Sequence, residues 1–86
     1  MSGDITSFEV SEHLTASGHT DSVHRSAWRP GYRDEQNSRR TVYVWHDGHD
    51  ERQYLDRYAQ SLRAAGYEVT LEQPRGGRPH LCVRRC

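Results

Sequence analysis

Residues 41–72 read TVYVWHDGHDERQYLDRYAQSLRAAGYEVTLE and have the clearest structural pattern in the 86-residue chain. The first six of them are almost all β-branched or aromatic, which predicts a strand. Because this run is apolar on both faces, we expect it to lie in the middle of its sheet. The dipeptide Asp47-Gly48 ends the predicted strand.

A helix is predicted next, from about residue 50 to residue 65. Its apolar residues recur at helical spacing and form one stripe, which consists of Leu55, Tyr58, Ala59, Leu62 and Ala65. Asp50 and Gln53 have the spacing of a capping box, and Gly66 stands where a left-handed residue commonly ends a helix. These signals agree with one another and define both ends of the helix.

Two more strands are predicted after the helix. Residues 67–72 alternate strictly, with Tyr67, Val69 and Leu71 on one face, which is typical of a half-buried strand. Residues 74–79 are rich in Pro and Gly and indicate a turn. Residues 80–85 then return as an antiparallel partner strand. The C-terminal half, residues 41–86, is therefore predicted to be a strand–helix–β-hairpin core.

Residues 1–40 form a weakly patterned N-terminal segment. Residues 5–10 could form a strand and residues 11–17 a short helix, whereas residues 21–28 fit a helix or a strand equally well. Residues 29–40 are expected to form a loop, mobile over 33–40, because that stretch contains no apolar residue. We expect one domain overall, of the α+β class, with a small single-layer sheet and one main helix packed on one face.

Composition limits the functions to consider. Only 33% of the residues are apolar, so a chain this short has a thin core, and a homo-oligomer stays an open alternative. The sequence contains no apolar run of about 18 residues that would span a membrane, and no secretory signal pattern. We therefore expect a cytoplasmic protein without membrane contact.

Arginine supplies all 12 basic residues, which balance 12 acidic ones. The basic candidates for binding nucleic acid or an acidic protein partner are Arg39, Arg40, Arg75, Arg78, His80, Arg84 and Arg85. A basic hairpin can follow a phosphate backbone, and Tyr43 and Trp45 could stack on bases if their face is open. Zero net charge and the neighbouring Glu68 and Glu72 argue against nucleic acid.

A second cluster lies at the junction between the predicted central strand and the helix. His46, Asp47 and His49 are weak candidates for a divalent metal site, since a tight zinc site needs three or four ligands. The simpler interpretation is that Asp47 or Asp50 caps the helix and Gly48 makes the turn. No catalytic residue and no cofactor is predicted.

Three functional hypotheses follow. The first is a small non-catalytic binding or regulatory module that acts through a sheet face or edge and the Arg-rich hairpin. The second is a nucleic-acid-binding accessory protein that uses this hairpin. The third is a metal-dependent enzyme centred on His46, Asp47 and His49, although an enzyme is the less favoured class.

Overall fold

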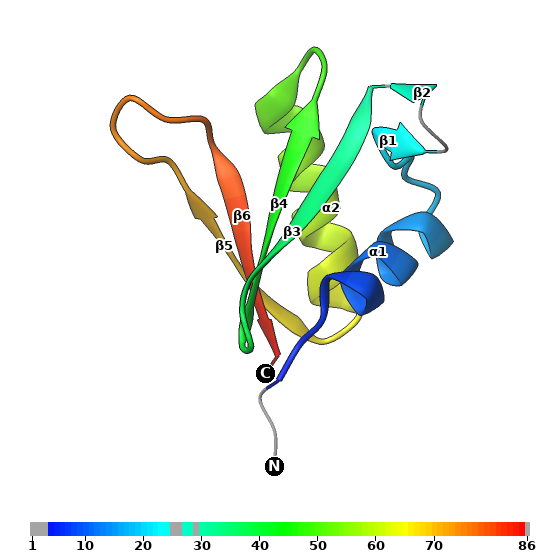
Figure 1. The fold of residues 1–86 in the computed structure, drawn as a ribbon, viewed down its shortest axis with the longest axis vertical. Coiled ribbons are helices and arrows are strands. Elements are labelled where there is room, and N and C mark those ends of the chain that lie inside the picture. Colours follow the sequence, from blue (N-terminus) through cyan, green and yellow to red (C-terminus); the bar gives the residue numbers. More distant parts are fainter. Residues whose placement is uncertain (1–3, 25–26, 29, 86) are drawn as a thin grey trace.

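The computed structural model describes residues 4–24, 27–28 and 30–85, and Figure 1 shows its fold. Within these described ranges, two helices and six strands follow one another. In chain order they are α1 (Ser7–Ala16), β1 (Val23–His24), β2 (Ala27–Trp28), β3 (Gly31–Ser38), β4 (Thr41–Asp47), α2 (Glu51–Ala64), β5 (Tyr67–Glu72) and β6 (His80–Arg85).

The main sheet has four strands in the order β3-β4-β6-β5, and every neighbouring pair is antiparallel. It follows that β4 and β5 run in the same direction, with β6 between them and α2 connecting them. The short strands β1 and β2 form a separate antiparallel pair. The predicted α+β class and the strand–helix–hairpin arrangement of the C-terminal half are confirmed.

The apolar stripe of α2 packs on the sheet as predicted. Leu55, Tyr58, Ala59 and Leu62 are buried, whereas Ala65 is exposed. After the helix, Gly66 has a φ of 96°, a left-handed conformation that side chains disfavour, so its predicted role as a helix end is confirmed. In the following hairpin, Val69 pairs with Val83 and Leu71 with Leu81, as the alternation predicts.

The N-terminus of α2 differs from the prediction. Asp50 is the N-cap residue, but its backbone is left-handed, with φ 59° and ψ 42°, and its side chain makes no cap hydrogen bond. The predicted capping box of Asp50 and Gln53 is therefore wrong. An N-cap side chain usually reaches the first helical amides from an extended backbone, and the left-handed backbone of Asp50 departs from that conformation.

The strand that was an alternative for residues 5–10 is wrong, because helix α1 begins at Ser7. Thr6 and Glu9 form a full capping box, in which the Thr6 side chain accepts from the Glu9 amide and the Glu9 side chain accepts from the Thr6 amide. This Thr-x-x-Glu spacing is a sequence signal for a helix start that periodicity alone overlooks. The side chains of Val10 and Leu14, on the inner side of α1, are buried.

The loop predicted over residues 29–40 is wrong for residues 31–38, which form the edge strand β3. Residues 39–40 do form a turn, and Arg29 lies outside the described residues. Most of its side chains are polar and half-buried or exposed, so the hydrophobic pattern of a strand is missing. The strand forms instead through its backbone ladder with β4. For residues 21–28, the helical alternative is excluded, because the described part contains the short strands β1 and β2.

Both helices cover the same face of the sheet, as Figure 1 shows. The side chains that alternate inward along β4 are Val42, Val44 and His46, and all three are buried. The other face of the sheet carries Tyr43 and Trp45, which are half-buried. Among the described residues, no helix is long and apolar enough to cross a membrane.

Candidate functional site

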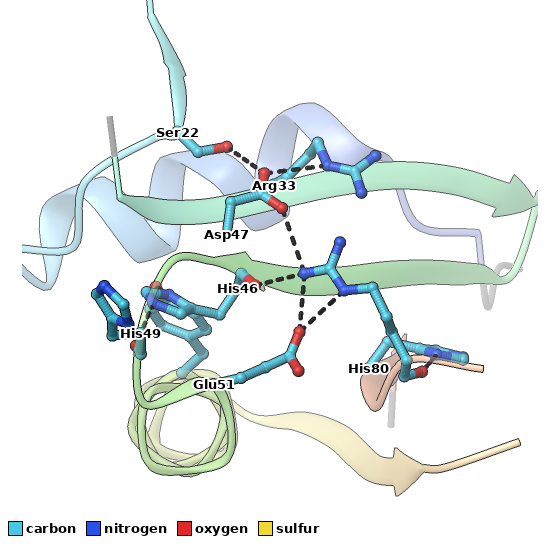
Figure 2. Close-up of polar contacts among 9 residues, drawn as sticks. Ser22, Arg33, His46, Asp47, His49, Glu51 and His80 are labelled. Carbon is cyan, nitrogen blue, oxygen red and sulfur yellow. Dashed lines mark hydrogen bonds and ion pairs between the residues drawn. The ribbon is translucent and has the colours of Figure 1, made fainter. Parts of the chain in front are cut away.

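A polar junction forms where β4 ends, and Figure 2 shows it. We use this name for Ser22, Arg33, Asp47, Glu51 and Arg78. The Asp47 carboxylate is its centre. Oδ2 accepts hydrogen bonds from Ser22 Oγ at 2.8 Å and from Arg33 Nε at 3.2 Å, and Oδ1 lies 3.3 Å from Arg78 Nη2. The junction therefore joins β4, β3 and two loops.

Arg78 ties the β5–β6 loop to the start of α2. Its Nη2 donates to the carbonyl oxygen of His46 at 2.6 Å and to Glu51 Oε2 at 2.8 Å, and its Nε donates to the same carboxylate oxygen at 3.0 Å. Burial by itself would raise the pKa of Asp47, but the hydrogen bond from Ser22 and the guanidinium groups of Arg33 and Arg78 hold this pKa below its usual value. Asp47 is thus an ionised, internally bonded carboxylate.

The His46 ring is buried and held at both nitrogens. Nδ1 lies 2.7 Å from the Tyr58 hydroxyl, and Nε2 lies 3.1 Å from the carbonyl oxygen of His49. Because a carbonyl oxygen only accepts, Nε2 carries the proton and Nδ1 accepts from Tyr58. Burial lowers the pKa of His46, and its ring stacks on Tyr54 at 4.2 Å. This histidine is a neutral core group with a fixed tautomer.

The three weak metal candidates lie close together in the structure, and the side chains of two of them, His46 and Asp47, bond to protein groups. His49 contributes its carbonyl oxygen to His46, and Asp47 bonds to Ser22, Arg33 and Arg78. Within the described ranges, no group of three or more His, Cys, Asp or Glu side chains is placed to hold a metal ion.

The structure does not bring the seven basic candidates together. Arg39 and Arg40 lie in the β3–β4 turn, at the same end of the sheet as Arg84 and Arg85. Arg75, Arg78 and His80 lie at the other end, in the β5–β6 loop and at the start of β6, as Figure 1 indicates. The seven residues therefore form two groups at opposite ends of the strands.

Several of these arginines also pair with carboxylates of the same chain. Besides Arg78, Arg85 pairs with Glu9, Arg39 lies 3.5 Å from Asp4, and Arg84 lies 3.9 Å from Glu68. The last three pairs are at least partly exposed, so each adds little to stability. They do reduce the positive field that these side chains would present to a phosphate backbone.

The sheet surface opposite the helices is the larger candidate site, and we call it the open face. Alternation along each strand and the register between strands place twelve side chains on it: Arg33, Glu35, Thr41, Tyr43, Trp45, Asp47, Glu68, Thr70, Glu72, His80, Cys82 and Arg84. Both helices lie on the other side of the sheet (Figure 1).

An aromatic patch of two half-buried side chains, Tyr43 and Trp45, and the buried side chain of His80 lies at the centre of the open face. The ring centroids of Tyr43 and Trp45 are 5.7 Å apart, and His80 lies 4.7 Å from Tyr43 and 5.2 Å from Trp45. The Arg33 guanidinium sits 5.0 Å above the Trp45 ring, within the range of a cation–π contact. From the sequence, His80 was a candidate for binding, and Tyr43 and Trp45 were expected to stack on bases if their face is open. The sequence gave no signal for Arg33, whose strand was missed.

Carboxylates surround this patch. The strands contribute Glu35, Asp47, Glu68 and Glu72 to the open face but only Arg33 and Arg84 as guanidinium groups. Glu72 lies 3.1 Å from His80 Nε2. The open face is thus an aromatic centre with a rim in which acidic groups outnumber basic ones.

Comparison of the chain with protein-family models, with curated proteins and with solved structures found no match in any of the three. The functional argument therefore rests on the geometry of the site.

Proposed function

We propose that the chain is a small non-catalytic binding module that binds a protein partner with the open face of its sheet. The observation that supports this is the aromatic patch of Tyr43, Trp45 and His80 at the centre of a sheet face that neither helix covers. Protein interfaces are enriched in aromatic residues and arginine at their centre and are polar at the rim. The open face has this arrangement.

The charges of the rim favour a protein over a nucleic acid. Glu35, Glu68 and Glu72 would repel a phosphate backbone that tracked across the patch. They suit a partner surface with an apolar centre and basic residues around it, because complementary charges speed association and exclude wrong partners.

The proposal is tested by capture experiments on matched variants. Trp45→Ala removes the largest ring of the patch, whereas Phe8→Ala removes an apolar side chain that is 70% exposed on α1, outside the open face. We expect the wild type and Phe8→Ala to retain the same partner, and Trp45→Ala to lose it while keeping its circular dichroism spectrum. Equal retention by all three proteins would overturn the proposal.

Nucleic-acid binding is the second candidate, and one observation favours it. The Arg33 guanidinium over Trp45, beside Tyr43 and His80, resembles the stacking platforms on which single-stranded bases lie. The division of the basic residues between two ends of the sheet weighs against it. The enzyme hypothesis gains no support from the geometry, since the polar groups of His46 and Asp47 bond within the chain.

A further inference from the structure

One row of the open face carries opposite charges at its two ends. The register places Arg33 beside Trp45, and Glu72 beside His80. Val44 pairs with Leu81, so Trp45 and His80 are neighbours as well. The row therefore runs Arg33–Trp45–His80–Glu72 across β3, β4, β6 and β5, with a cation on one edge strand and an anion on the other.

From this row we infer that the partner of the open face is a second copy of the same chain, an inference that rests on the proposed function. Two sheets can stack about 10 Å apart with their strands nearly aligned. A two-fold axis parallel to the strands then lays β3 over β5 of the second copy and β4 over β6. Rotation about this axis does not change the position of a residue along the strand direction, so each row meets the same row of the second copy. Arg33 therefore faces Glu72 of the second copy, and Trp45 faces His80. The symmetry forms each contact twice.

The other rows agree with this arrangement. The next row is Glu35–Tyr43–Cys82–Thr70, so Glu35 faces Thr70 of the second copy. In the third row, Glu68 on β5 faces the β3 edge near Asn37. No two carboxylates of the edge strands are opposed.

A two-fold axis that is perpendicular to the strands and passes through the middle row is disfavoured by charge. It would lay β3 over β3 of the second copy, so that Glu35 in the middle row faced its own symmetry mate. Like charges placed opposite one another weaken an interface. The charges therefore favour the axis parallel to the strands over this one. They also favour the second copy as occupant, because Arg33 at one edge of the face complements Glu72 at the opposite edge.

The test uses charge reversal and mixing, measured by sedimentation over about 1 to 500 μM protein, a range that detects weak to moderate self-association. We expect the wild type and the Phe8→Ala control to dimerise. Arg33→Glu and Glu72→Arg should each raise the dimer Kd by about tenfold or more, since each places like charges in both symmetric contacts. An equimolar mixture of the two variants should dimerise again, because both contacts then join opposite charges.

A wild type that stays monomeric throughout this range, or variants that dimerise as the wild type does, would overturn the inference. A monomeric chain that still captures a partner in a Trp45-dependent way would leave the proposed function standing, with a different protein as the partner. If Arg33→Glu does not fold because its contact with Asp47 is lost, Glu72→Gln and Glu72→Arg decide. A dimer Kd that is higher for Glu72→Gln than for the wild type, and higher again for Glu72→Arg, supports the inference. Unchanged Kd values contradict it.

Discussion

At the residue scale, the ends of the strands show how this small chain satisfies buried polar groups. Asp47 and His46 are adjacent in sequence but face opposite sides of the sheet. The carboxylate is met by a hydroxyl and two guanidinium groups, and the imidazole by a phenol and a carbonyl oxygen. A sequence rich in His and Asp therefore produces a structural junction here, because each group finds a protein partner.

Asp34 is the exception, and it leads to a prediction about pH. Within the described part of the chain, its Oδ2 is buried without a hydrogen-bond partner. Burial, together with the nearby Asp21 carboxylate, raises the pKa of Asp34 to about 6. Its ordinary value is about 3.9, so between these two values the folded chain binds more protons than the unfolded chain. The Asp34 contribution to stability therefore falls as pH rises from about 4 to about 6.

Asp34→Asn should remove this dependence. Relative to the wild type, the variant should gain stability as pH rises from 4 to 7, in urea unfolding measured at each pH. Glu12→Gln, which changes an exposed carboxylate on α1, serves as the control and should follow the wild type. A constant difference between Asp34→Asn and the wild type across the range would show that Asp34 does not titrate in this interval.

At the element scale, the buried side of α2 holds the C-terminal half together. Leu62 is fully buried in the core cluster that also contains Val69 and Val83. Leu62→Ala should destabilise the fold by about 2–5 kcal/mol, as deletions of buried leucine side chains do. Gln60→Ala on the exposed side of α2 should change stability by no more than about 0.5 kcal/mol. Equal urea midpoints for the two variants would show that the helix face is misassigned.

The pairing of the edge strand β3 predicts protection from hydrogen exchange, whereas its sequence predicts a mobile loop. Its backbone pairs with β4 from Gly31 to Ser38, with an irregularity between Gln36 and Ser38. The amides of β3 that point toward β4 should therefore be protected in hydrogen exchange. The Tyr32 amide should be protected as well, because it donates to the carbonyl oxygen of Thr20 at 2.8 Å, while the other amides that point away from β4 exchange quickly. The alternation should weaken near Ser38. Uniformly fast exchange over residues 31–38 would favour the loop that the composition suggests.

The contrast between β3 and β5 shows what the sequence can predict. In β5, Tyr67 and Val69 alternate with exposed polar residues, because one face packs on α2. In β3, the polar residues Asp34 and Gln36 occupy inward positions, so the sequence does not show the apolar–polar alternation of a strand. The backbone nevertheless pairs with β4 along its length. That Tyr43 and Trp45 share one face of a central strand was predictable from the alternation of that strand. The placement of Arg33 beside Trp45 was not, since it depends on the register of the missed strand.

At the scale of the whole molecule, charges that are segregated along the sequence become paired across the fold. The acidic N-terminal segment meets basic residues from the far end of the chain. Arg85 pairs with Glu9 and donates to the carbonyl oxygen of Asp4 at 2.8 Å, and Arg39 pairs with Asp4. The Arg-rich appearance of the hairpin is therefore a poor guide to its surface potential, because part of that charge is neutralised by elements that the sequence places far away.

This pairing predicts weak binding to nucleic acid. The seven basic candidates lie at two ends of the sheet, and acidic groups outnumber guanidinium groups on the open face. A titration of labelled single-stranded DNA or RNA at about 150 mM salt should give no saturable binding below roughly 100 μM protein. The double variant Glu68→Gln, Glu72→Gln should bind more tightly if the acidic rim is what excludes phosphate. Saturable binding by the wild type, with a log Kd that rises steeply with log salt, would contradict the prediction and favour the stacking platform of Tyr43, Trp45 and His80 as a nucleic-acid site.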